Sequence, residues 1–220
     1  MTHGAHPTNR RQMPEALAAD VFDPGLAVAW AEIARADPAT LFDIERAAMR
    51  SAVPHRQREF TAGRIAARAA MGRDLAIPMA DDRSPLWPTG ANGSISHAGG
   101  WAIAIAGQPE QMLGVDLERD EPLPGEVLDS VLTPTERAWF GSDADTWARV
   151  IFSAKECAYK AQYPRSRQIF GFDAFEITLN PSRGSFHAKF QQAIAPFAMG
   201  DRLAGRFSRA GGYILTGIVA

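Results

Sequence analysis

The sequence predicts a mixed α/β (α+β) fold made of two similar halves. Two amphipathic helices, near residues 56–71 and 146–163, are each accompanied by short runs in which apolar and polar residues alternate, as in antiparallel strands. This unit of a helix and strands occurs once before Gln108 and once after it. We therefore expect an N-terminal half at residues 15–108, a C-terminal half at residues 109–220 and an active-site cleft between them.

The composition is that of a globular chain with a sizeable core. Of the 220 residues, 46% are hydrophobic and 22% are charged, which excludes collagen-like, coiled-coil and wholly disordered chains. The formal net charge of −2 gives no reason to expect nucleic acid as a partner. Residues 84–109, the longest stretch without charge, contain five glycines and three prolines, so no transmembrane segment is expected. A single cysteine suits a reducing compartment, and we expect a cytoplasmic protein.

Residues 1–14 are polar and contain no apolar run. We expect a flexible tail there and no signal peptide.

The first helix carries a local excess of positive charge. Its small and apolar residues follow helical spacing, so Arg64 and Arg68 are expected on its outer face. A solvated face with pairing inside the helix is one interpretation, but few acids lie nearby, which favours a phosphate-bearing partner. Seven arginines lie between residues 46 and 73, in and around this helix: Arg46, Arg50, Arg56, Arg58, Arg64, Arg68 and Arg73.

A proline-broken loop over residues 74–93 leads into a hairpin. The run Ser94–Ser96 and the run at 101–106 flank the pair Gly99-Gly100. His97 lies where the first strand opens into this turn, and the free backbone N–H groups there suit an anion. The alternative is a histidine that only satisfies local hydrogen bonds.

A strand over residues 113–118 presents two carboxylates on one face. Apolar and polar residues alternate in it, which places Asp116 and Glu118 side by side. Two carboxylates this close require a cation or a proton. Mg²⁺ fits, with Mn²⁺ as an alternative, because it takes oxygen ligands from few carboxylates and from substrate phosphates. A solvated strand face is the competing interpretation.

The second half continues with helices and three strands. Thr133-Pro-Thr-Glu136 has the capping residue, the proline and the glutamate of a helix start. The longest helix follows, and Pro164 is expected to end it. Alternating runs predict antiparallel strands at residues 175–179, 186–190 and 213–219.

One short segment of the long helix offers an oxygen ligand and two cations. Glu156 follows Lys155 directly and lies one turn before Lys160. An ordinary intrahelical ion pair, worth about 0.3–0.5 kcal/mol, is the alternative. Together with Asp116 and Glu118, however, Glu156 supplies a third carboxylate for a metal.

These segments together resemble the 4′-phosphopantetheinyl transferase superfamily. The resemblance is greatest to the group typified by the enterobactin synthase component and extends to the surfactin-type enzymes. It covers about residues 50–180, and Ala98 departs from the cysteine or threonine that is frequent after the histidine. The segments that carry it are Arg56-x-x-Glu-Phe-Thr-Ala-Gly-Arg64, Arg83-Ser-Pro-Leu-Trp-Pro88, Gly93-Ser-Ile-Ser-His97, Gly114-Val-Asp-Leu-Glu118 and Phe152-Ser-Ala-Lys-Glu-Cys-Ala-Tyr-Lys-Ala161.

The resemblance implies a pseudo-twofold fold with coenzyme A in the cleft, and it implies a role for each matching residue. Asp116, Glu118 and Glu156 would hold Mg²⁺ against the pyrophosphate. Arg56, Arg64 and His97 would bind the 3′-phosphate, while Arg83 and Ser96 would line the nucleotide site. Lys155 and Lys160 would neutralise charge on the phosphates.

The implied reaction is transfer of 4′-phosphopantetheine from coenzyme A to a serine of an apo acyl or peptidyl carrier protein. The serine attacks the β-phosphorus, adenosine 3′,5′-bisphosphate leaves, and the base is Glu156 or a metal-bound water. Asp116, Glu156 and Lys160 are thus the expected catalytic residues. Because two internal halves complete one cleft, we expect a monomer.

Two other functions compete with this one. Another Mg²⁺-dependent nucleotidyl or glycosyl transferase would also use the pair Asp116 and Glu118, although the chain has no common glycine-rich nucleotide loop. A noncatalytic module that binds coenzyme A or a carrier protein would have lost a carboxylate or a lysine, and here all are present.

Carrier proteins of this kind are typically acidic, as the resemblance implies, so a basic or apolar surface near the cleft is expected to bind them. Arg165 and Arg167 follow the long helix and precede Ile169, Phe170 and Phe172. A solvated loop is the alternative there.

Overall fold

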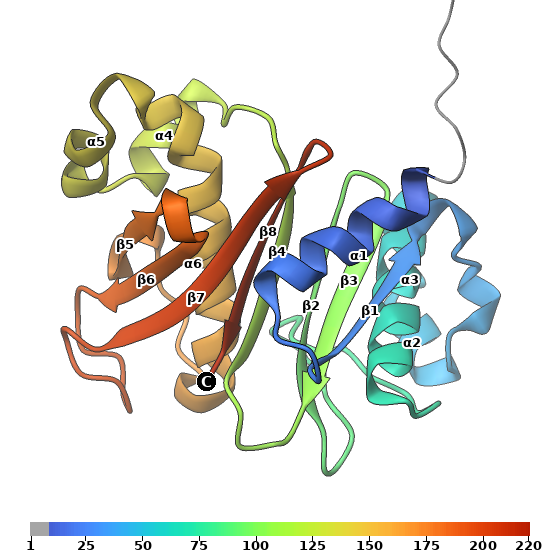
Figure 1. Cartoon of the computed structure of the whole chain (residues 1–220). Coiled ribbons are helices and arrows are strands. Elements are labelled where there is room, and N and C mark those ends of the chain that lie inside the picture. Colours follow the sequence, from blue (N-terminus) through green and yellow to red (C-terminus); the bar gives the residue numbers. More distant parts are fainter. Residues whose placement is uncertain (1–8) are drawn as a thin grey trace, which may run out of the picture.

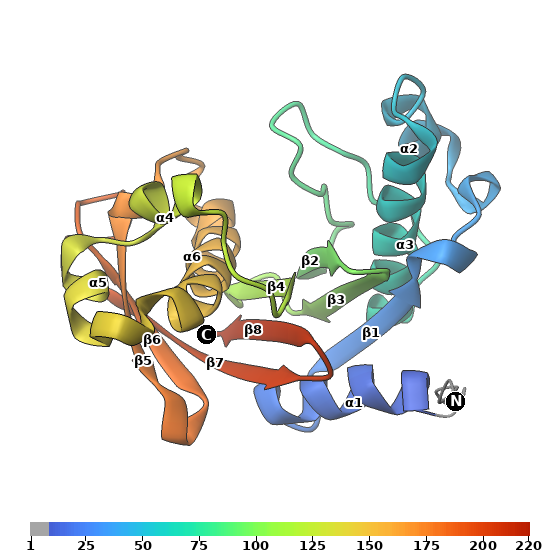
Figure 2. The same cartoon turned by 90° about the horizontal axis from the view of Figure 1, so that it is seen from above.

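The computed structural model describes residues 9–220, without the side chains of residues 9–14, 142, 144 and 145. Two antiparallel sheets lie side by side in it, each with a long helix on the same face (Figures 1 and 2). This arrangement confirms the predicted α/β class and the two-half organisation.

The first half contains a three-stranded sheet of order β1-β3-β2. Its elements are α1 (Asn9–Val21), β1 (Ala27–Glu32), the 3₁₀ turns Ile33–Arg35 and Pro38–Thr40, α2 (Asp43–Ala48), α3 (Pro54–Met71), β2 (Asn92–Ala98) and β3 (Trp101–Gly107). The central strand β3 is buried on both faces, because α3 covers one face and α1 packs against Ile103 and Ile105 on the other.

The second half contains a five-stranded sheet of order β4-β8-β7-β6-β5. Its elements are β4 (Leu113–Arg119), α4 (Gly125–Val131), α5 (Pro134–Phe140), α6 (Ala144–Ser166), β5 (Phe175–Asn180), β6 (Ser185–Phe190), β7 (Arg202–Ala210) and β8 (Tyr213–Val219), with 3₁₀ turns at Gly141–Asp143, Phe172–Ala174 and Pro181–Arg183. Helix α6 packs closely on β4, since a Cβ at Gly114 would lie 2.2 Å from the carbonyl oxygen of Cys157. Glycine at position 114 therefore lets the strand that carries Asp116 approach the helix that carries Glu156.

Helix α1 crosses the line where the two sheets meet, on the face opposite α3 and α6 (Figure 2). Leu17, Val21 and Phe22 pack there against apolar residues of both sheets, among them Ile105 and Leu215. The N-terminal helix thus covers the joint from behind and leaves the other face open.

The same buried arrangement holds the long helix in each half. In the first half, Glu45 accepts hydrogen bonds from Arg68 of α3 (3.0 Å) and from the backbone N–H of Ile77 (2.7 Å). Its counterpart Glu136 accepts from Lys155 of α6 (2.9 Å) and from the N–H of Ile177 (2.7 Å).

The likeness between the two arrangements extends to the start of the short helix. Each glutamate also accepts from a backbone N–H three residues earlier, that of Phe42 or Thr133. The side chains of both glutamates are fully buried. This repeated unit supports the duplication inferred from the sequence.

Most predicted elements are confirmed, including the helix start at Thr133 and the hairpin at Gly99-Gly100, whose glycines both have positive φ. Three predictions are wrong. Residues 9–14 belong to α1 instead of a tail, while residues 1–8 lie outside the described residues. Pro164 does not end α6, which continues to Ser166, because a proline in the last turn removes few hydrogen bonds. Arg64 and Arg68 are buried and do not lie on an outer face, because Arg64 donates to the carbonyl of Ile77 and Arg68 donates to Glu45.

Removing either buried glutamate should destabilise the protein strongly. Glu45→Ala removes the buried carboxylate that pairs with Arg68, and Glu136→Ala removes the one that pairs with Lys155. Each change also removes the acceptor of two backbone N–H groups. We expect each change to lower the free energy of unfolding by about 3–5 kcal/mol. Urea denaturation followed by circular dichroism measures this.

The matched control is Glu121→Ala, which breaks an exposed pair with Arg119 (2.6 Å). This change should cost less than about 1 kcal/mol. An equal loss in all three variants would contradict a special role for the buried pairs.

Candidate active site in the cleft between the two halves

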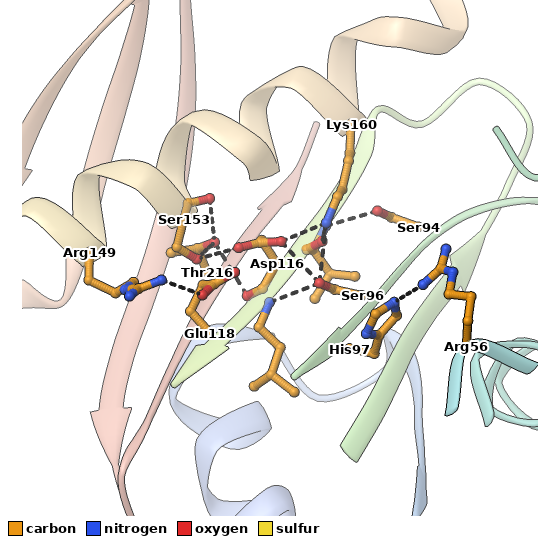
Figure 3. Close-up of polar contacts among 12 residues, drawn as sticks. Arg56, Ser94, Ser96, His97, Asp116, Glu118, Arg149, Ser153, Lys160 and Thr216 are labelled. Carbon is orange, nitrogen blue, oxygen red and sulfur yellow. Dashed lines mark hydrogen bonds and ion pairs between the residues drawn. The ribbon is translucent and has the colours of Figure 1, made fainter. Parts of the chain in front are cut away.

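The predicted site residues of β2, β4 and α6 converge on the open face of the joint (Figure 3). Strand β2 is an edge of the first sheet, and β4 is an edge of the second. Helices α3 and α6 lie on either side of this line (Figure 2). The site is therefore built from both halves.

Two serine hydroxyls join the two sheets. Ser94 Oγ accepts a hydrogen bond from the N–H of Val115 (3.0 Å), and Ser96 Oγ accepts one from the N–H of Leu117 (3.1 Å). Because β-strand side chains alternate, both hydroxyls come from the same side of β2. The Ser-Ile-Ser motif thus serves as a lateral connection to β4.

Asp116 is the buried centre of the site. Its Oδ1 accepts from Lys160 Nζ (2.6 Å) and from Ser96 Oγ (3.0 Å), and its Oδ2 accepts from Ser153 Oγ (2.8 Å). Ser153 Oγ in turn lies 2.9 Å from Thr216 Oγ1. Both carboxylate oxygens are therefore hydrogen-bonded, and one of the donors is a cation.

Lys160 is held by three acceptors at this centre. Besides Asp116, its ammonium donates to Ser96 Oγ and to the carbonyl of Val115, both at 3.2 Å. Burial works against its charge, but the carboxylate and hydrogen bond of Asp116 outweigh burial and raise the pKa of Lys160. Lys160 is thus a fixed cation at the floor of the cleft.

Glu118 lies two residues after Asp116 on β4, and its pKa is shifted well above its usual value. Burial and the nearby Asp116 raise the pKa of Glu118 to about 7, while Arg149 acts in the opposite direction. Arg149 Nη1 is 3.0 Å from Glu118 Oε2, and its other nitrogens donate to the carbonyls of Glu121 and Pro122. The arginine therefore ties Glu118 to the turn that follows β4.

Glu156 projects from α6 into a cavity of about 490 Å³ that also reaches Lys160. The cavity is bounded by α6 and by the loop that joins α3 to β2, including Arg83 and Trp87. Burial and the charge of Asp116 raise the pKa of Glu156, although Lys160 opposes the effect. A glutamate with a raised pKa is a stronger proton acceptor than an ordinary glutamate.

The loop is tied to α6 across this cavity. The hydroxyl of Tyr163 donates a hydrogen bond to the carboxylate of Asp82. Arg83 follows with a positive φ of 69°, an uncommon conformation for a residue other than glycine. Arg83 is one of the residues that line the cavity.

Within the described ranges, no three His, Cys, Asp or Glu side chains gather closely enough to enclose a metal ion. The three predicted ligands nevertheless fit Mg²⁺ in their chemistry. Mg²⁺ commonly takes one or two carboxylates and fills its other positions with water and substrate phosphate. Burial is the main cause of the raised pKa values of Glu118 and Glu156, the charge of Asp116 adds to it, and a bound cation would oppose both effects.

His97 and Arg56 meet above the floor of the cleft, as Figure 3 shows. Arg56 Nη1 lies 2.8 Å from His97 Nε2 and 3.2 Å from Glu59 Oε2. Burial, together with the nearby charges of Arg56 and Lys160, lowers the pKa of His97, and Glu59 and Asp116 oppose this change. Arg56 thus places a positive charge beside His97, and Glu59 offsets part of this charge.

Arg64 lies deeper in α3 than the prediction assumed. Its Nε donates to the carbonyl of Ile77 (2.9 Å), and its guanidinium stacks over Phe60. Burial lowers the pKa of Arg64 to about 10, and Nη2 is buried with no hydrogen-bond partner among the described residues.

Two other residues that were predicted to contact coenzyme A are instead bonded to other parts of the protein. Lys155 is 1% exposed and is paired with Glu136 and the carbonyl of Val131, so the sequence-based role of neutralising phosphate charge is corrected to a role in the core. Ser96 uses its proton on Asp116 and its lone pairs on Leu117 and Lys160. Its full hydrogen-bonding capacity is thus taken, and its role is the connection between the sheets.

Sequence reasoning missed several residues that support the site: Ser94, Ser153, Thr216, Arg149 and Glu59. Arg149 lies seven residues before Glu156 on α6, a spacing of two helical turns, which would have placed both on one face. The hydroxyls gave no usable signal, because their partners come from other strands. A second cavity, about 830 Å³, is lined by the end of α1 and by parts of β6 and β7, and Ala91 is the one lining residue that it shares with the cavity at Glu156.

Among the helices of the described residues, none is long and apolar enough to cross a membrane.

Two family models match the chain. One, described as the 4′-phosphopantetheinyl transferase N-terminal domain, matches residues 44–107, and the other, described as the 4′-phosphopantetheinyl transferase superfamily, matches residues 112–204.

Individual relatives give the same result. The 4′-phosphopantetheinyl transferase Svp of Streptomyces mobaraensis is 38% identical over 199 residues, which is 83% of this chain and 80% of the relative. The 4′-phosphopantetheinyl transferase PptT of Mycobacterium tuberculosis is 32% identical over 92% of this chain and 95% of the relative. Enterobactin synthase component D of Salmonella typhi is 38% identical over 63% of this chain and 62% of the relative.

Proposed function

Because the chain belongs to the 4′-phosphopantetheinyl transferase superfamily and is a transferase, we propose that it moves 4′-phosphopantetheine from coenzyme A to a serine hydroxyl of an apo acyl or peptidyl carrier protein. One observation carries the proposal: Asp116 and Glu118 of β4 lie with Glu156 and Lys160 of α6 beside a cavity whose other wall is a loop of the first half. Acids and a fixed cation in one cleft are what a phosphoryl transfer requires, because it depends on positioning and charge neutralisation.

Coenzyme A would lie along the cleft with its 3′-phosphate on the first half. Arg56 and His97, whose side chains lie 2.8 Å apart, would bind this phosphate. Arg64 adds charge behind them, since it and Arg56 lie close enough for their charges to interact. Arg83, on the loop over the cavity, would contact the nucleotide.

The reacting groups would meet at the floor of the cleft. The serine oxygen forms a bond to the β-phosphorus, the bond from that phosphorus to the bridging oxygen breaks, and adenosine 3′,5′-bisphosphate leaves. Glu156 accepts the serine proton, which its raised pKa favours. Lys160, held by Asp116, stabilises negative charge on the phosphates.

Asp116, Glu118 and Glu156 would hold Mg²⁺, which when bound neutralises charge on the pyrophosphate and polarises it. Arg149 already balances part of this negative charge through Glu118. Since one chain supplies both walls of the cavity, we infer that a monomer is active.

The direct test is transfer to an apo carrier protein, read by mass spectrometry of the intact carrier with coenzyme A and Mg²⁺. Asp116→Ala should lower the rate by at least about a hundredfold, because Lys160 and the proposed metal site lose their shared carboxylate. Excess Mg²⁺ should restore little activity. Circular dichroism checks that the variant is folded.

Asp129→Ala serves as the matched control, because Asp129 is a 90% exposed carboxylate paired with Arg137. It should transfer at the wild-type rate. Near-normal transfer by Asp116→Ala would overturn the assignment of the site.

A second prediction concerns the 3′-phosphate. Coenzyme A should bind more tightly than dephospho-coenzyme A, and the difference should shrink about tenfold or more in Arg56→Ala and in His97→Ala. A charge-assisted contact is worth about 1.5–3 kcal/mol, which corresponds to this factor. Isothermal titration calorimetry with both ligands measures it.

Arg35→Ala is the control for this prediction, since Arg35 is an exposed arginine paired only with Glu32 among the described residues. The difference between ligands should be unchanged in this variant. Equal weakening of both ligands in the Arg56 and His97 variants would indicate a structural role instead.

A third prediction concerns carrier-protein docking. Arg165 and Arg167 lie at the end of α6, beside Ile169, which is 77% exposed, and across the cavity mouth from Leu86, which is 45% exposed. The double change Arg165→Glu and Arg167→Glu should raise KM for the carrier protein several-fold at low salt and leave KM for coenzyme A nearly unchanged. Steady-state kinetics at two ionic strengths measures both constants.

The pair Arg35→Glu and Arg183→Glu alters net charge equally at exposed positions elsewhere. This control should leave both constants unchanged. A carrier KM that stays at the wild-type value in the first double variant at low salt would place docking on another surface.

A further inference from the structure

Glu59 is an acidic side chain in the middle of the proposed phosphate site. It projects from α3, its side chain is 18% exposed, and its Oε2 is 3.2 Å from Arg56 Nη1. Its Oε1 is 3.0 Å from His55 Nε2 and 3.7 Å from His97 Nδ1. A carboxylate among these groups repels a phosphate, so its presence there calls for a physical role.

The geometry fixes which nitrogen of His97 carries the proton. An arginine can only donate, so Nε2 of His97 accepts the 2.8 Å hydrogen bond from Arg56. The imidazole is then neutral, and its proton is on Nδ1, the nitrogen that faces Glu59. In this form His97 has no N–H to give to a phosphate at Nε2.

The charges around His97 come from three elements. Arg56 and Glu59 belong to α3, Lys160 belongs to α6, and Asp116 belongs to β4. Burial, Arg56 and Lys160 favour the neutral ring, while Glu59 and Asp116 favour the charged ring. A phosphate that takes over the Arg56 contact would remove one obstacle to protonation and add a negative charge beside Nε2.

We propose that Glu59 is a positioning residue through which His97 takes up a proton when a phosphate monoester binds, so that Nδ1–H faces Glu59 while Nε2–H donates to the phosphate. The inference rests on the proposed function, because the phosphate monoester is the 3′-phosphate of coenzyme A. The proton comes from solvent, and no covalent bond changes. Glu59 acts only through His97, and its carboxylate balances the imidazolium that forms.

Proton uptake is measured on the full-length wild-type chain by titration calorimetry in two buffers of different ionisation enthalpy. At about pH 7.5 the phosphate monoester is already a dianion, so its own titration contributes little. We expect proton uptake with coenzyme A to exceed that with dephospho-coenzyme A by close to one proton, because the acids near the pyrophosphate respond to both ligands alike. The ratio of the coenzyme A affinity to the dephospho-coenzyme A affinity should then fall by up to about tenfold per pH unit above pH 7.5.

Variants separate Glu59 from its neighbours. Glu59→Gln should lose most of the proton uptake and weaken coenzyme A binding about tenfold. Glu59→Asp should restore part of the uptake. His55→Gln is the matched control, because His55 also contacts Glu59 and is 76% exposed, and it should keep the wild-type uptake.

Binding measurements on the wild-type chain alone separate this inference from the proposed function. Binding of coenzyme A with no more proton uptake than dephospho-coenzyme A overturns this inference and leaves the proposed function standing. Full uptake in folded Glu59→Gln, or its loss in His55→Gln, also overturns it. Failure of coenzyme A to bind the wild-type chain at all overturns the proposed function and the inference together.

Discussion

The hydroxyl of Ser96 is the interaction on which the cleft depends. It gives its proton to Asp116 and receives hydrogen bonds from the backbone of Leu117 and from Lys160, so one atom links β2, β4 and α6. Ser94 repeats the backbone link two residues earlier. Because these contacts replace a continuous backbone ladder between the sheets, the relative placement of the two halves and the position of the central carboxylate are determined together.

The three acids of the site differ in how their charge is balanced. Asp116 is fully hydrogen-bonded and has Lys160 as a close cation. Glu118 shares Arg149 with two backbone carbonyls, and its pKa of about 7 lies well above its usual value because burial and Asp116 dominate. Glu156 lines the cavity with a raised pKa. The site thus holds negative charge that is incompletely balanced by the protein, and it is suited to bind a cation and to accept a proton.

Sequence patterns predicted most helices and strands, but they failed for side chains whose partners are distant in the sequence. Period-two alternation identified most strands, but Arg202–Ala210 was missed because four of its nine residues are arginine or glycine, although Leu203 and Phe207 are buried as alternation requires. The alternation at residues 113–118 was interpreted correctly as a strand, but the ion pair of Asp116 with Lys160 was not predicted. Lys155 was misassigned because its partner Glu136 lies nineteen residues away, and only the fold shows that it is the counterpart of Arg68.

The contact between Asp82 and Tyr163 determines how a ligand reaches the site. It joins a loop of the first half to α6 of the second across the mouth of the cavity, and Asp82 is exposed to solvent. Opening the mouth breaks one solvent-facing contact between two side chains and leaves the serine links and both sheets intact. We therefore expect changes in residues 74–91 to alter the rates of entry and release while the geometry of the reacting groups is preserved.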